Sequence, residues 1–461
     1  MHIKEYIGKH VHMIGIGGSS MSGLAVMLLK MGIIVSGSDS VESYATSDLK
    51  SRGVTVFIGH QSKNIIDADL IVYSAAIGND NLERIAAKEK GIPEMERSVL
   101  LGQLMEGYNH SINVCGTHGK TTTTSMIAQI LVDTQQDPTV HIGGQLDYIG
   151  GSTRIGGHQV FVAEACEYRR SFLQFHPTIA VITNIEEDHL DYYKDIDDIE
   201  SAFSQFIQIL PPNGVLVGNG DDERVGKLMK ECKNKTVSFG LTNKNDWYPE
   251  SNKWDDLGCA SFSLMHKNEA ICKVSIGIPG TFNLLHALAA IAAANEVGVS
   301  PIEAAMSISR FKAPHRRFEF TGEVCGVKLY TDYGHNPAEM KTALMNASLQ
   351  PHKKLWAVMQ PHTYSRVKSL FSQYIHCCDL ADEILITDIF AAREKDPGDI
   401  HSLDLVNAIS STGKSVHYTP GFDEAERYLR DHWSPGDLVI TMSCGNIHLL
   451  NSQIQRHGDQ Y

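Results

Sequence analysis

Short apolar runs recur along the chain, and each is followed by small or polar residues and then by a segment with helical periodicity. The runs are His12–Ile16, Ile112–Cys115, Val160–Ala163, Ile179–Thr183, Leu355–Met359 and Val439–Met442. Continuous apolar strands that alternate with helices are typical of parallel sheets covered on both faces. The pattern therefore predicts an α/β protein whose ligands bind beyond the carboxyl ends of the strands.

The length of 461 residues predicts about three domains. We expect a Rossmann-like first domain over residues 1–107, because a new strand and a glycine-rich loop begin directly after Gly102–His110. A central domain with a P-loop ATPase-type, mostly parallel sheet is expected over residues 108–312. A proline and a charge cluster in Phe311–Arg317 predict the second linker, so that a C-terminal Rossmann-like domain spans residues 313–461.

Composition narrows the classes of partner. The formal net charge is −14 and no basic stripe occurs, which argues against a nucleic-acid partner. The sequence contains no run of about 18 apolar residues, so no membrane-spanning helix is expected. The N-terminus carries charges and histidines where a signal peptide needs an apolar core, so we expect a cytoplasmic protein. The nine cysteines form no C-x-x-C pair, and we expect reduced thiols.

The strongest chemical signal is Val114–Thr124 (VCGTHGKTTTT), which lies between an apolar strand and a helical segment. Glycines let backbone N–H groups turn toward phosphate oxygens, and a helix N-terminus adds positive charge. Lys120 can then neutralise phosphate charge, and the Thr121 hydroxyl can coordinate magnesium. The generic loop has about four residues between its first glycine and its Gly-Lys pair, whereas this loop has two. A glycine turn with a solvated lysine is therefore the alternative. The residues predicted to bind ATP here are Gly116, Thr117, His118, Gly119, Lys120, Thr121 and Thr122.

A second glycine loop, Gly15–Gly23, follows a strand and opens a helix, and Asp39 ends the next strand-like run. Taken alone, this pattern indicates a dinucleotide site with Asp39 on a ribose, and hence an NAD-dependent oxidoreductase. The third glycine of G-x-G-x-x-G would fall at Ser20, however, so the fingerprint is incomplete. A tight turn without a ligand is the other alternative.

The loop GTHGKTTTT, followed by TNIEEDHLDYY and DYGHNP, resembles the Mur ligases of peptidoglycan synthesis, and the resemblance runs from about His12 to Asn446. The order of motifs most resembles the branch that joins L-alanine to UDP-N-acetylmuramate. The resemblance implies these two substrates, an acyl-phosphate intermediate, ATP as the energy source, and two Mg²⁺ ions for which Mn²⁺ can substitute. A monomer or homodimer is expected. The alternatives are a Mur-type ligase for another amino acid, one that adds a peptide to a recycled UDP-sugar, and a non-catalytic nucleotide-binding regulator.

Two residues beyond the phosphate loop are candidate metal ligands. Glu164 ends the run VFVAEA, and His189 follows the run TIAVITN, so both should lie at the loop's edge of a parallel sheet. Magnesium prefers oxygen ligands, which suits Glu164 better than His189. The resemblance implies that both hold the second magnesium, and that with Lys120 they are the catalytic residues. The alternatives are a helix cap or surface carboxylate for Glu164 and an orienting, hydrogen-bonded role for His189.

The resemblance also implies roles for residues outside the central motifs. The UDP-sugar is expected at Gly15, Gly17, Gly18, Ser19, Asp39 and Ser74; further ATP contacts are expected at Asn283, Arg317 and Asp332; and the incoming amino acid is expected at His335 and Arg366. An arginine fork matches a free carboxylate with two parallel hydrogen bonds. A helix cap at Asn283 and plain surface charge at Arg317 are the alternatives.

The sequence departs from the family pattern at a few positions. Glu164–Arg169 reads EACEYR where family members usually have EADESD, a change near the sugar-peptide substrate. Asn336 and Thr363 replace a histidine and an arginine, which bears on amino-acid selectivity. Several related ligases carry a carbamylated lysine at a position that falls near Ser204 here. No lysine lies in Ser201–Pro211, and this absence fits the alanine-adding branch.

Overall fold

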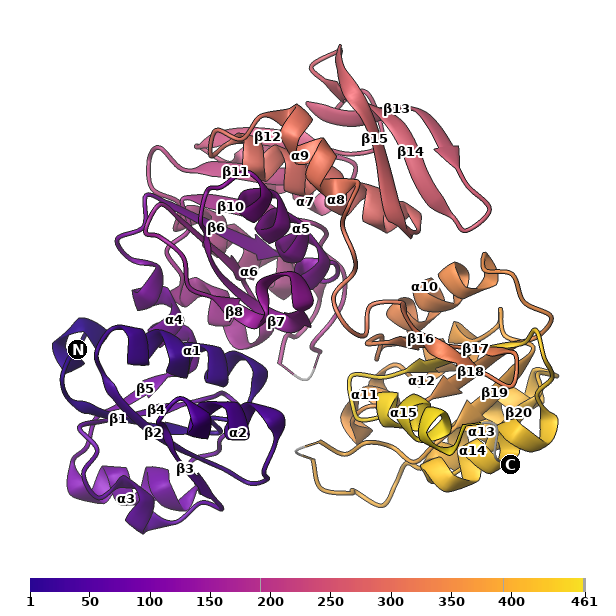
Figure 1. The fold of residues 1–461 in the computed structure, drawn as a ribbon, viewed down its shortest axis with the longest axis horizontal. Coiled ribbons are helices and arrows are strands. Elements are labelled where there is room, and N and C mark those ends of the chain that lie inside the picture. The colour runs from indigo at the N-terminus through magenta and orange to yellow at the C-terminus, as the bar shows by residue number, and fades with distance from the viewer. Residues whose placement is uncertain (191, 393, 459–461) are drawn as a thin grey trace. The chain divides into compact units, whose positions relative to one another are not determined.

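The computed structural model describes residues 1–190, 192–392 and 394–458 and contains three β-sheets flanked by helices (Figure 1). The predicted three-domain α/β architecture is confirmed, while the domain limits at 107/108 and 312/313 stay predictions. The chain forms two compact units. Unit 1 comprises Met1–Glu250, Ser263–Lys273 and Leu285–Ile308, and unit 2 comprises Ser251–Phe262, Val274–Leu284 and Ser309–Tyr461.

The first sheet has five parallel strands in the order β3-β2-β1-β4-β5. Its strands are β1 (His10–Ile14), β2 (Ile34–Asp39), β3 (Thr55–Ile58), β4 (Leu70–Tyr73) and β5 (Glu94–Glu96), and its helices are η1 (Ile3–Tyr6), α1 (Ser19–Lys30), α2 (Tyr44–Ser51), η2 (Ser62–Ile65), α3 (Leu82–Lys90) and α4 (Arg97–Met105). The strand order reverses beside β1, because β2 lies on one side of it and β4 on the other. Ligands of such sheets bind at this reversal, beyond the carboxyl ends of the strands.

The second sheet has ten strands in the order β15-β14-β13-β12-β11-β10-β6-β9-β7-β8. Its strands are β6 (His110–Cys115), β7 (Thr139–Leu146), β8 (Gly151–Arg154), β9 (Val160–Glu164), β10 (Ile179–Ile182), β11 (Val215–Asn219), β12 (Lys235–Phe239), β13 (Trp247–Trp254), β14 (Cys259–His266) and β15 (Glu269–Pro279). The strands from β7 to β12 pair in parallel, while β7 and β8 are antiparallel, so the sheet is mixed around a parallel centre. Strand β6 lies between β9 and β10, where the order reverses.

The helices of the second sheet are α5 (Lys120–Asp133), η3 (Asp147–Ile149), η4 (Tyr168–Gln174), α6 (Ile196–Gln208), α7 (Glu223–Glu231), α8 (Thr281–Asn295) and α9 (Pro301–Ile308). Helix α8 is fully buried from Ala287 to Ala294, as is typical of a helix that is apolar on all faces. Gln129 on α5 donates a side-chain hydrogen bond to the carbonyl of Ser307 on α9 at 3.0 Å. The helix that follows β6 is thus held by the last helix of unit 1.

The third sheet has six strands in the order β16-β17-β21-β18-β19-β20. Its strands are β16 (Glu319–Val324), β17 (Val327–Asp332), β18 (Leu355–Met359), β19 (Glu383–Ile386), β20 (Val416–Tyr418) and β21 (Leu438–Met442), and its helices are α10 (Pro337–Ser348), α11 (Tyr364–Ser369), α12 (Phe371–Cys377), α13 (Ser402–Ser411), α14 (Phe422–His432) and α15 (His448–His457). Only the edge pair β16 and β17 is antiparallel among the strand pairs of this sheet that the structure describes. The other strands are parallel, so their carboxyl ends share one edge.

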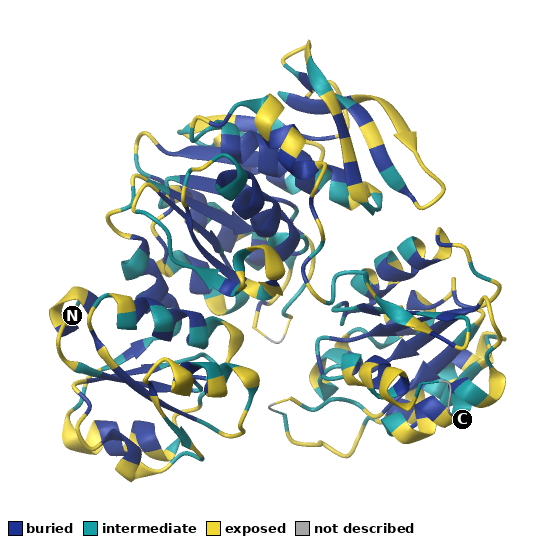
Figure 2. Ribbon diagram, in the orientation of Figure 1, coloured by how far each residue is buried: buried dark blue, intermediate teal, exposed yellow. Residues whose placement is uncertain are grey.

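Burial follows the layers of each sheet. Figure 2 shows the central strands of the sheets as buried and the outward faces of the flanking helices as exposed. Within the described ranges, no helix combines the length and apolar character needed to cross a bilayer. All nine cysteines are free thiols in the structure.

Candidate active site

The loop between β6 and α5 turns on two glycines that no other residue could replace without a clash. Gly116 and Gly119 have φ values of 136° and 83°, a region that favours glycine. A β-carbon would lie 2.0 Å from Thr183 Oγ1 at Gly116, and 2.1 Å from His286 Nε2 at Gly119. The glycine spacing of this shortened loop is therefore fixed by its neighbours after β10 and on α8.

Thr117 and His118 tie the loop to the segment after β10. The Thr117 hydroxyl accepts a hydrogen bond from the backbone N–H of Glu186 at 2.8 Å and donates to its carbonyl at 3.2 Å. The backbone N–H of His118 donates to Asn184 Oδ1 at 2.8 Å. A hydrogen bond with the His118 ring lowers the pKa of the Glu186 carboxyl. These hydrogen bonds thus fix the loop against the segment after β10.

Lys120 begins α5, and its ammonium group makes three hydrogen bonds. Its Nζ atom donates to the carbonyls of Gly116 at 2.6 Å and Thr117 at 3.0 Å, and to Glu167 Oε1 at 3.0 Å. Burial disfavours the charged ammonium, but the Glu167 carboxylate outweighs this effect and raises the pKa of Lys120. Thr121 and Thr122 lie in the same first turn and are buried. Lys120 is therefore charged and already bound to its own loop.

Glu167 joins Lys120 to His189. Its side chain is 3% exposed, and its Oε1 atom is 3.8 Å from His189 Nε2. The hydroxyl of Tyr193 donates to the Glu167 carbonyl at 2.5 Å, and the Tyr168 ring lies 4.7 Å from the His189 ring, centroid to centroid. His189 has a positive φ of 53°, which is uncommon for a non-glycine residue and marks a constrained site. The structure thus brings together Lys120, Glu167 and His189.

Sequence reasoning did not single out Glu167. A signal was available, because the second glutamate of EACEYR is shared with the EADESD pattern of the family. The predicted ligand Glu164 ends β9, one strand away from β6, and its Oε1 atom accepts a hydrogen bond from the Gly143 N–H at 2.9 Å. Both glutamates therefore belong to the edge of the sheet that carries the phosphate loop.

The residues at this edge fit a magnesium ion that shares the oxygens of a nucleotide. Among the described residues, no group of three or more His, Cys, Asp or Glu side chains could hold a metal by itself. Magnesium commonly takes only one or two protein carboxylates and completes its shell with water and phosphate oxygens. The Oε2 atom of Glu167 is buried and has no hydrogen-bond partner in the described structure, as expected for an oxygen that awaits a cation.

The glycine loop of the first sheet follows β1, where the strand order reverses. The N–H of Gly17 donates to Asp39 Oδ2 at 2.9 Å, so Asp39 at the end of β2 holds the loop. Gly15 has a φ of 78°, and a β-carbon there would lie 3.7 Å from Ser74 Oγ beyond β4. Gly18 caps α1 without a side-chain hydrogen bond. Residues that follow β1, β2 and β4 therefore lie close together at the carboxyl edge of this sheet.

Ser20, where a dinucleotide fingerprint has glycine, connects the first sheet to the second. Its hydroxyl lies 2.8 Å from Nε2 of His141 on β7 and accepts a hydrogen bond from Arg97 Nη1 at 3.1 Å. Burial, reinforced by the charge of Arg97, lowers the pKa of His141 to about 3, so this histidine is neutral at physiological pH. One residue earlier, the Ser19 carbonyl accepts a hydrogen bond from the Ser152 hydroxyl at 3.1 Å.

In unit 2, Asp332 and Arg317 lie at the end of β17. The Asp332 carboxylate accepts hydrogen bonds from the N–H groups of Gly334 and Phe318, both at 2.7 Å, and burial raises its pKa. The Arg317 guanidinium lies 4.9 Å from the centre of the Tyr333 ring. Asn283, near the start of α8, donates a side-chain hydrogen bond to the Pro279 carbonyl at 2.7 Å.

His335 and Arg366 lie beyond the carboxyl ends of β17 and β18. His335 Nδ1 is 3.1 Å from Glu339 Oε2, and although burial opposes the charge, Glu339 and the Cys444 thiol raise the pKa of His335 to about 10. The imidazole is therefore a cation at neutral pH. Arg366 Nη1 is 3.0 Å from His362 Nδ1, and the His362 ring lies 5.8 Å from the His335 ring.

The two substitutions near His335 have local structural roles. The Asn336 side chain accepts a hydrogen bond from the Glu339 N–H at 2.9 Å and so caps α10. Thr363 precedes α11 with a φ of 61°, and its N–H donates to the carbonyl of Phe390 at 3.0 Å. Both residues shape the backbone that presents His335 and Arg366.

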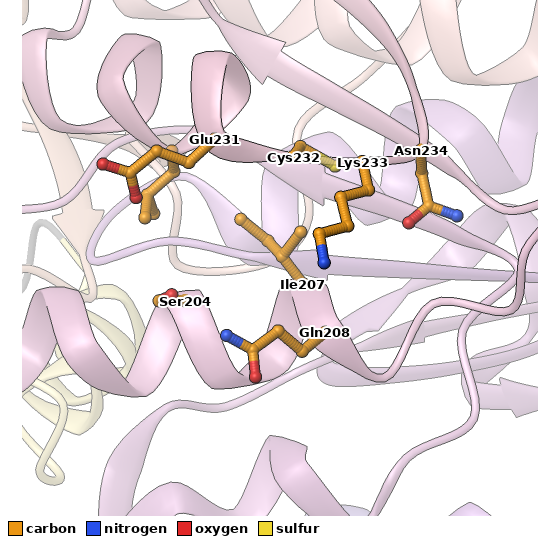
Figure 3. A pocket seen from close by; sticks show the side chains of 8 residues that line it. Ser204, Ile207, Gln208, Glu231, Cys232, Lys233 and Asn234 are labelled. Atoms are coloured by element: carbon orange, nitrogen blue, oxygen red, sulfur yellow. The ribbon is translucent and has the colours of Figure 1, made fainter.

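A pocket of about 460 Å³ opens between α6 and the end of α7 (Figure 3). Its lining residues are Ser204, Ile207, Gln208, Leu228, Glu231, Cys232, Lys233 and Asn234. Ser204 on α6, near which the family resemblance places the carbamylated lysine of related ligases, lines this pocket. None of the predicted substrate residues lines it.

Sequence models of one family match three consecutive parts of the chain. The model described as the Mur ligase family catalytic domain matches residues 10–109, the Mur ligase middle domain matches residues 114–294, and the glutamate ligase domain matches residues 316–445. These ranges contain the first glycine loop, the phosphate loop with its glutamates, and the His335 region respectively. The three sheets therefore correspond to the modules of a single family.

Individual relatives agree with these matches. The chain is 46% identical over 441 residues to the UDP-N-acetylmuramate–L-alanine ligase of Acetivibrio thermocellus, which covers 95% of this chain and 94% of that protein. The crystal structure of UDP-N-acetylmuramate–alanine ligase from Thermotoga maritima superimposes with a TM-score of 0.83 at 25% identity, covering 97% of this chain and 98% of that one. A murein peptide ligase from Psychrobacter arcticus gives 0.76, also at 25% identity and with the same coverage. The motifs, the sheets and these relatives together show that the chain belongs to the Mur ligase family.

Proposed function

We propose that this protein is an ATP-dependent ligase that joins L-alanine to UDP-N-acetylmuramate in peptidoglycan synthesis, releasing ADP and phosphate. The observation that carries the proposal is the phosphate loop with Lys120 beside Glu167 and His189. It occurs in a chain that is 46% identical, over 95% of its length, to a UDP-N-acetylmuramate–L-alanine ligase. The reaction corresponds to EC 6.3.2.8.

The first step is a phosphoryl transfer to the substrate itself. The lactyl carboxylate of UDP-N-acetylmuramate attacks the γ-phosphate of ATP, which gives an acyl-phosphate and ADP. Lys120 stabilises the charge on the phosphates, and the glycines of the loop allow backbone N–H groups to approach them. Bound magnesium would neutralise phosphate charge, and Thr121, Glu164, Glu167 and His189 are the residues proposed to hold it, with Mn²⁺ as an alternative ion.

The second step forms the amide bond. The neutral amine of L-alanine attacks the activated carbonyl, and phosphate leaves with the electron pair of the broken C–O bond. The charged His335 and the Arg366 guanidinium are proposed to bind the free carboxylate of alanine. This binding orients the amine and leaves the reacting atoms free. No protein nucleophile is required, because the substrate's own carboxylate is activated.

The remaining substrate contacts are proposed from the family resemblance together with their places in the fold. For the UDP-sugar they are Gly15, Gly17, Gly18, Ser19, Asp39 and Ser74, and for ATP they include Asn283, Arg317 and Asp332. We propose the domain limits 1–107, 108–312 and 313–461 for these functions. A cytoplasmic location and a monomeric or homodimeric state are also proposed.

The proposal is tested by identifying the product. The purified chain is incubated with ATP, Mg²⁺, UDP-N-acetylmuramate and an equimolar mixture of L-alanine, L-serine, glycine and an L-alanine-containing tripeptide. Mass spectrometry should find UDP-N-acetylmuramoyl-L-alanine as the main product, with equimolar ADP. A tripeptide adduct without an alanine adduct would instead assign the chain to the peptide-adding ligases, such as the Psychrobacter arcticus neighbour.

A further inference from the structure

All three N–H donors of the phosphate-loop lysine are used within the protein. An ammonium group has three N–H donors, and the three hydrogen bonds of Lys120 go to Gly116 O, Thr117 O and Glu167 Oε1. To bind a phosphate oxygen, Lys120 must give up at least one of these partners. The two carbonyls belong to the loop on which the nucleotide would lie, whereas Glu167 comes from the segment after β9. Glu167 is therefore the partner that competes with a nucleotide for the lysine.

Glu167 cannot lose its lysine without replacement. Its side chain is 3% exposed, so water would not solvate the carboxylate freely. Its Oε2 atom already lacks a hydrogen-bond partner among the described residues, and the nearby His189 Nε2 lies at 3.8 Å from Oε1. An ionised carboxylate that is buried and unpaired is strongly unfavourable. Nucleotide phosphates placed beside it would add repulsion between like charges.

Glu167 would need a new positive partner, and a divalent cation would supply one. Glu167 would hold this cation when Lys120 moves to the phosphates, and the charge of both the carboxylate and the phosphates would be offset. We propose that Glu167 is a positioning residue that couples nucleotide binding to cation binding, by holding Lys120 until a cation takes its place. The inference rests on the proposed nucleotide site. It adds that a nucleotide without a cation is disfavoured by the protein itself, and not only by the charge of the phosphates.

The experiment measures this coupling by calorimetric binding, without turnover. The non-hydrolysable analogue AMP-PNP is titrated into the full chain and into Glu167→Gln, each with EDTA and with saturating Mg²⁺. In Glu167→Gln, the cation-free affinity should rise by roughly fivefold to tenfold, because the competitor for Lys120 loses its charge. The factor by which Mg²⁺ improves affinity should shrink by at least the same amount. Circular dichroism confirms that the variant is folded.

Glu186→Gln is the matched control. Glu186 is also a glutamate beside the phosphate loop, but its side chain is 51% exposed and pairs with His118 at 3.5 Å. Its replacement removes the same charge from the same neighbourhood, so the Mg²⁺ factor should stay near that of the original chain. Equal changes in both variants would reduce the effect to general electrostatics and overturn the inference.

Two further outcomes are decisive. Cation-free AMP-PNP affinity that falls in Glu167→Gln would mean that Glu167 merely supports the loop, and the coupling role would be rejected. If the original chain does not bind AMP-PNP even with Mg²⁺, the proposed nucleotide site itself fails.

A second variant tests the inference if Glu167→Gln does not fold. The affinity of Lys120→Met for Mn²⁺ is then measured by electron paramagnetic resonance and compared with that of the original chain. Freed from the lysine, Glu167 should then bind Mn²⁺ at least roughly fivefold more tightly, and unchanged binding would contradict the coupling.

Discussion

His335 carries its positive charge well into the alkaline range because of what surrounds it. Glu339 and Cys444 raise the pKa of the imidazole to about 10 in spite of its burial. A neutral histidine would present only one donor and no charge to a carboxylate, whereas the imidazolium offers a charge-assisted hydrogen bond. The charge state of this residue should therefore be visible in the affinity for the amino acid.

The KM for L-alanine should depend on pH through His335. Below about pH 10 the imidazole is protonated and binds the carboxylate, and as pH rises through this value the KM should increase by roughly tenfold. In His335→Gln the KM should be high at all pH values, so the difference between the two profiles removes the titration of alanine itself. His376→Gln, an exposed histidine on α12, serves as the control and should retain the original profile.

Replacing Lys120 should affect both the turnover number and the free energy of unfolding, for two different reasons. Lys120→Met should lower kcat by at least about 10²-fold to 10³-fold, because the phosphate loop loses the ammonium group proposed to stabilise charge on the phosphates. It should also lower the free energy of unfolding by about 3 kcal/mol, since Glu167 is left buried without its partner.

The double variant distinguishes the two effects. Lys120→Met with Glu167→Gln should regain most of the lost stability in urea denaturation, because the unpaired charge is gone. Phosphate release should stay at the low level of the single variant. Recovery of turnover in the double variant would show that Lys120 does not act on the phosphates.

At the scale of elements, α1 packs against the antiparallel edge of the second sheet. Gly23 lies inside α1, and a β-carbon there would lie 1.9 Å from Oγ1 of Thr153 on β8. The same helix places Ser20 against His141 on β7. A glycine that is unfavourable in a helix by propensity and a serine thus allow two sheets of unit 1 to approach each other.

Gly23→Ala should destabilise the protein although alanine is the better helix former. Propensity alone would stabilise a helix by roughly 0.5–1 kcal/mol, but the clash with Thr153 should reverse the sign and cost about 1–3 kcal/mol. Gly226→Ala on α7 is the matched control, because its β-carbon would meet only the Gly220 carbonyl at 3.6 Å. Urea denaturation should show a loss for the first variant and a small gain for the second.

The sequence predicted those elements whose signal is local. The runs Ile112–Cys115 and Val160–Ala163 lie within β6 and β9, because strands buried on both faces are apolar throughout. The polar stretch 233–269 has no clear period, and it forms β12, β13 and β14, whose residues are partly exposed. Strands with one open face and irregular exposure give a weak pattern.

The candidate site was predictable only as far as each residue carries its own signal. Glycines before a Gly-Lys-Thr identify a phosphate loop without any tertiary information. Glu167 depends on Lys120, which lies far earlier in the chain, and Ser20 depends on His141 in another sheet. Pairings of this kind arise from the fold, so a single sequence cannot reveal them.

At the scale of the whole molecule, the two compact units each have their own buried tryptophan. Trp247 in unit 1 stacks on His266 with ring centroids 4.0 Å apart. Trp356 in unit 2 donates a hydrogen bond to Asp437 Oδ2 at 3.0 Å. Chains with separate cores commonly depart from two-state unfolding. Each indole therefore reports on the stability of its own unit.

Unfolding should show two transitions when each reporter is isolated. Variants that keep only Trp247 or only Trp356, with the other tryptophans changed to phenylalanine, should give different urea midpoints by fluorescence. Adding Gly23→Ala should lower the Trp247 midpoint and leave the Trp356 midpoint in place. Coincident midpoints that move together would instead show that the molecule unfolds as one cooperative block.

The contact between Gly119 and His286 bears on how the protein is made. The phosphate loop reaches its final shape against a helix that the ribosome synthesises much later, and α5 is also held by α9. A nascent chain that ends before α8 lacks this support, so its loop is unfinished even though every loop residue is present. ATP should therefore not stabilise the chain during the early steps of folding. Fragments that are released before α8 is made should neither bind the nucleotide nor be protected by it from degradation.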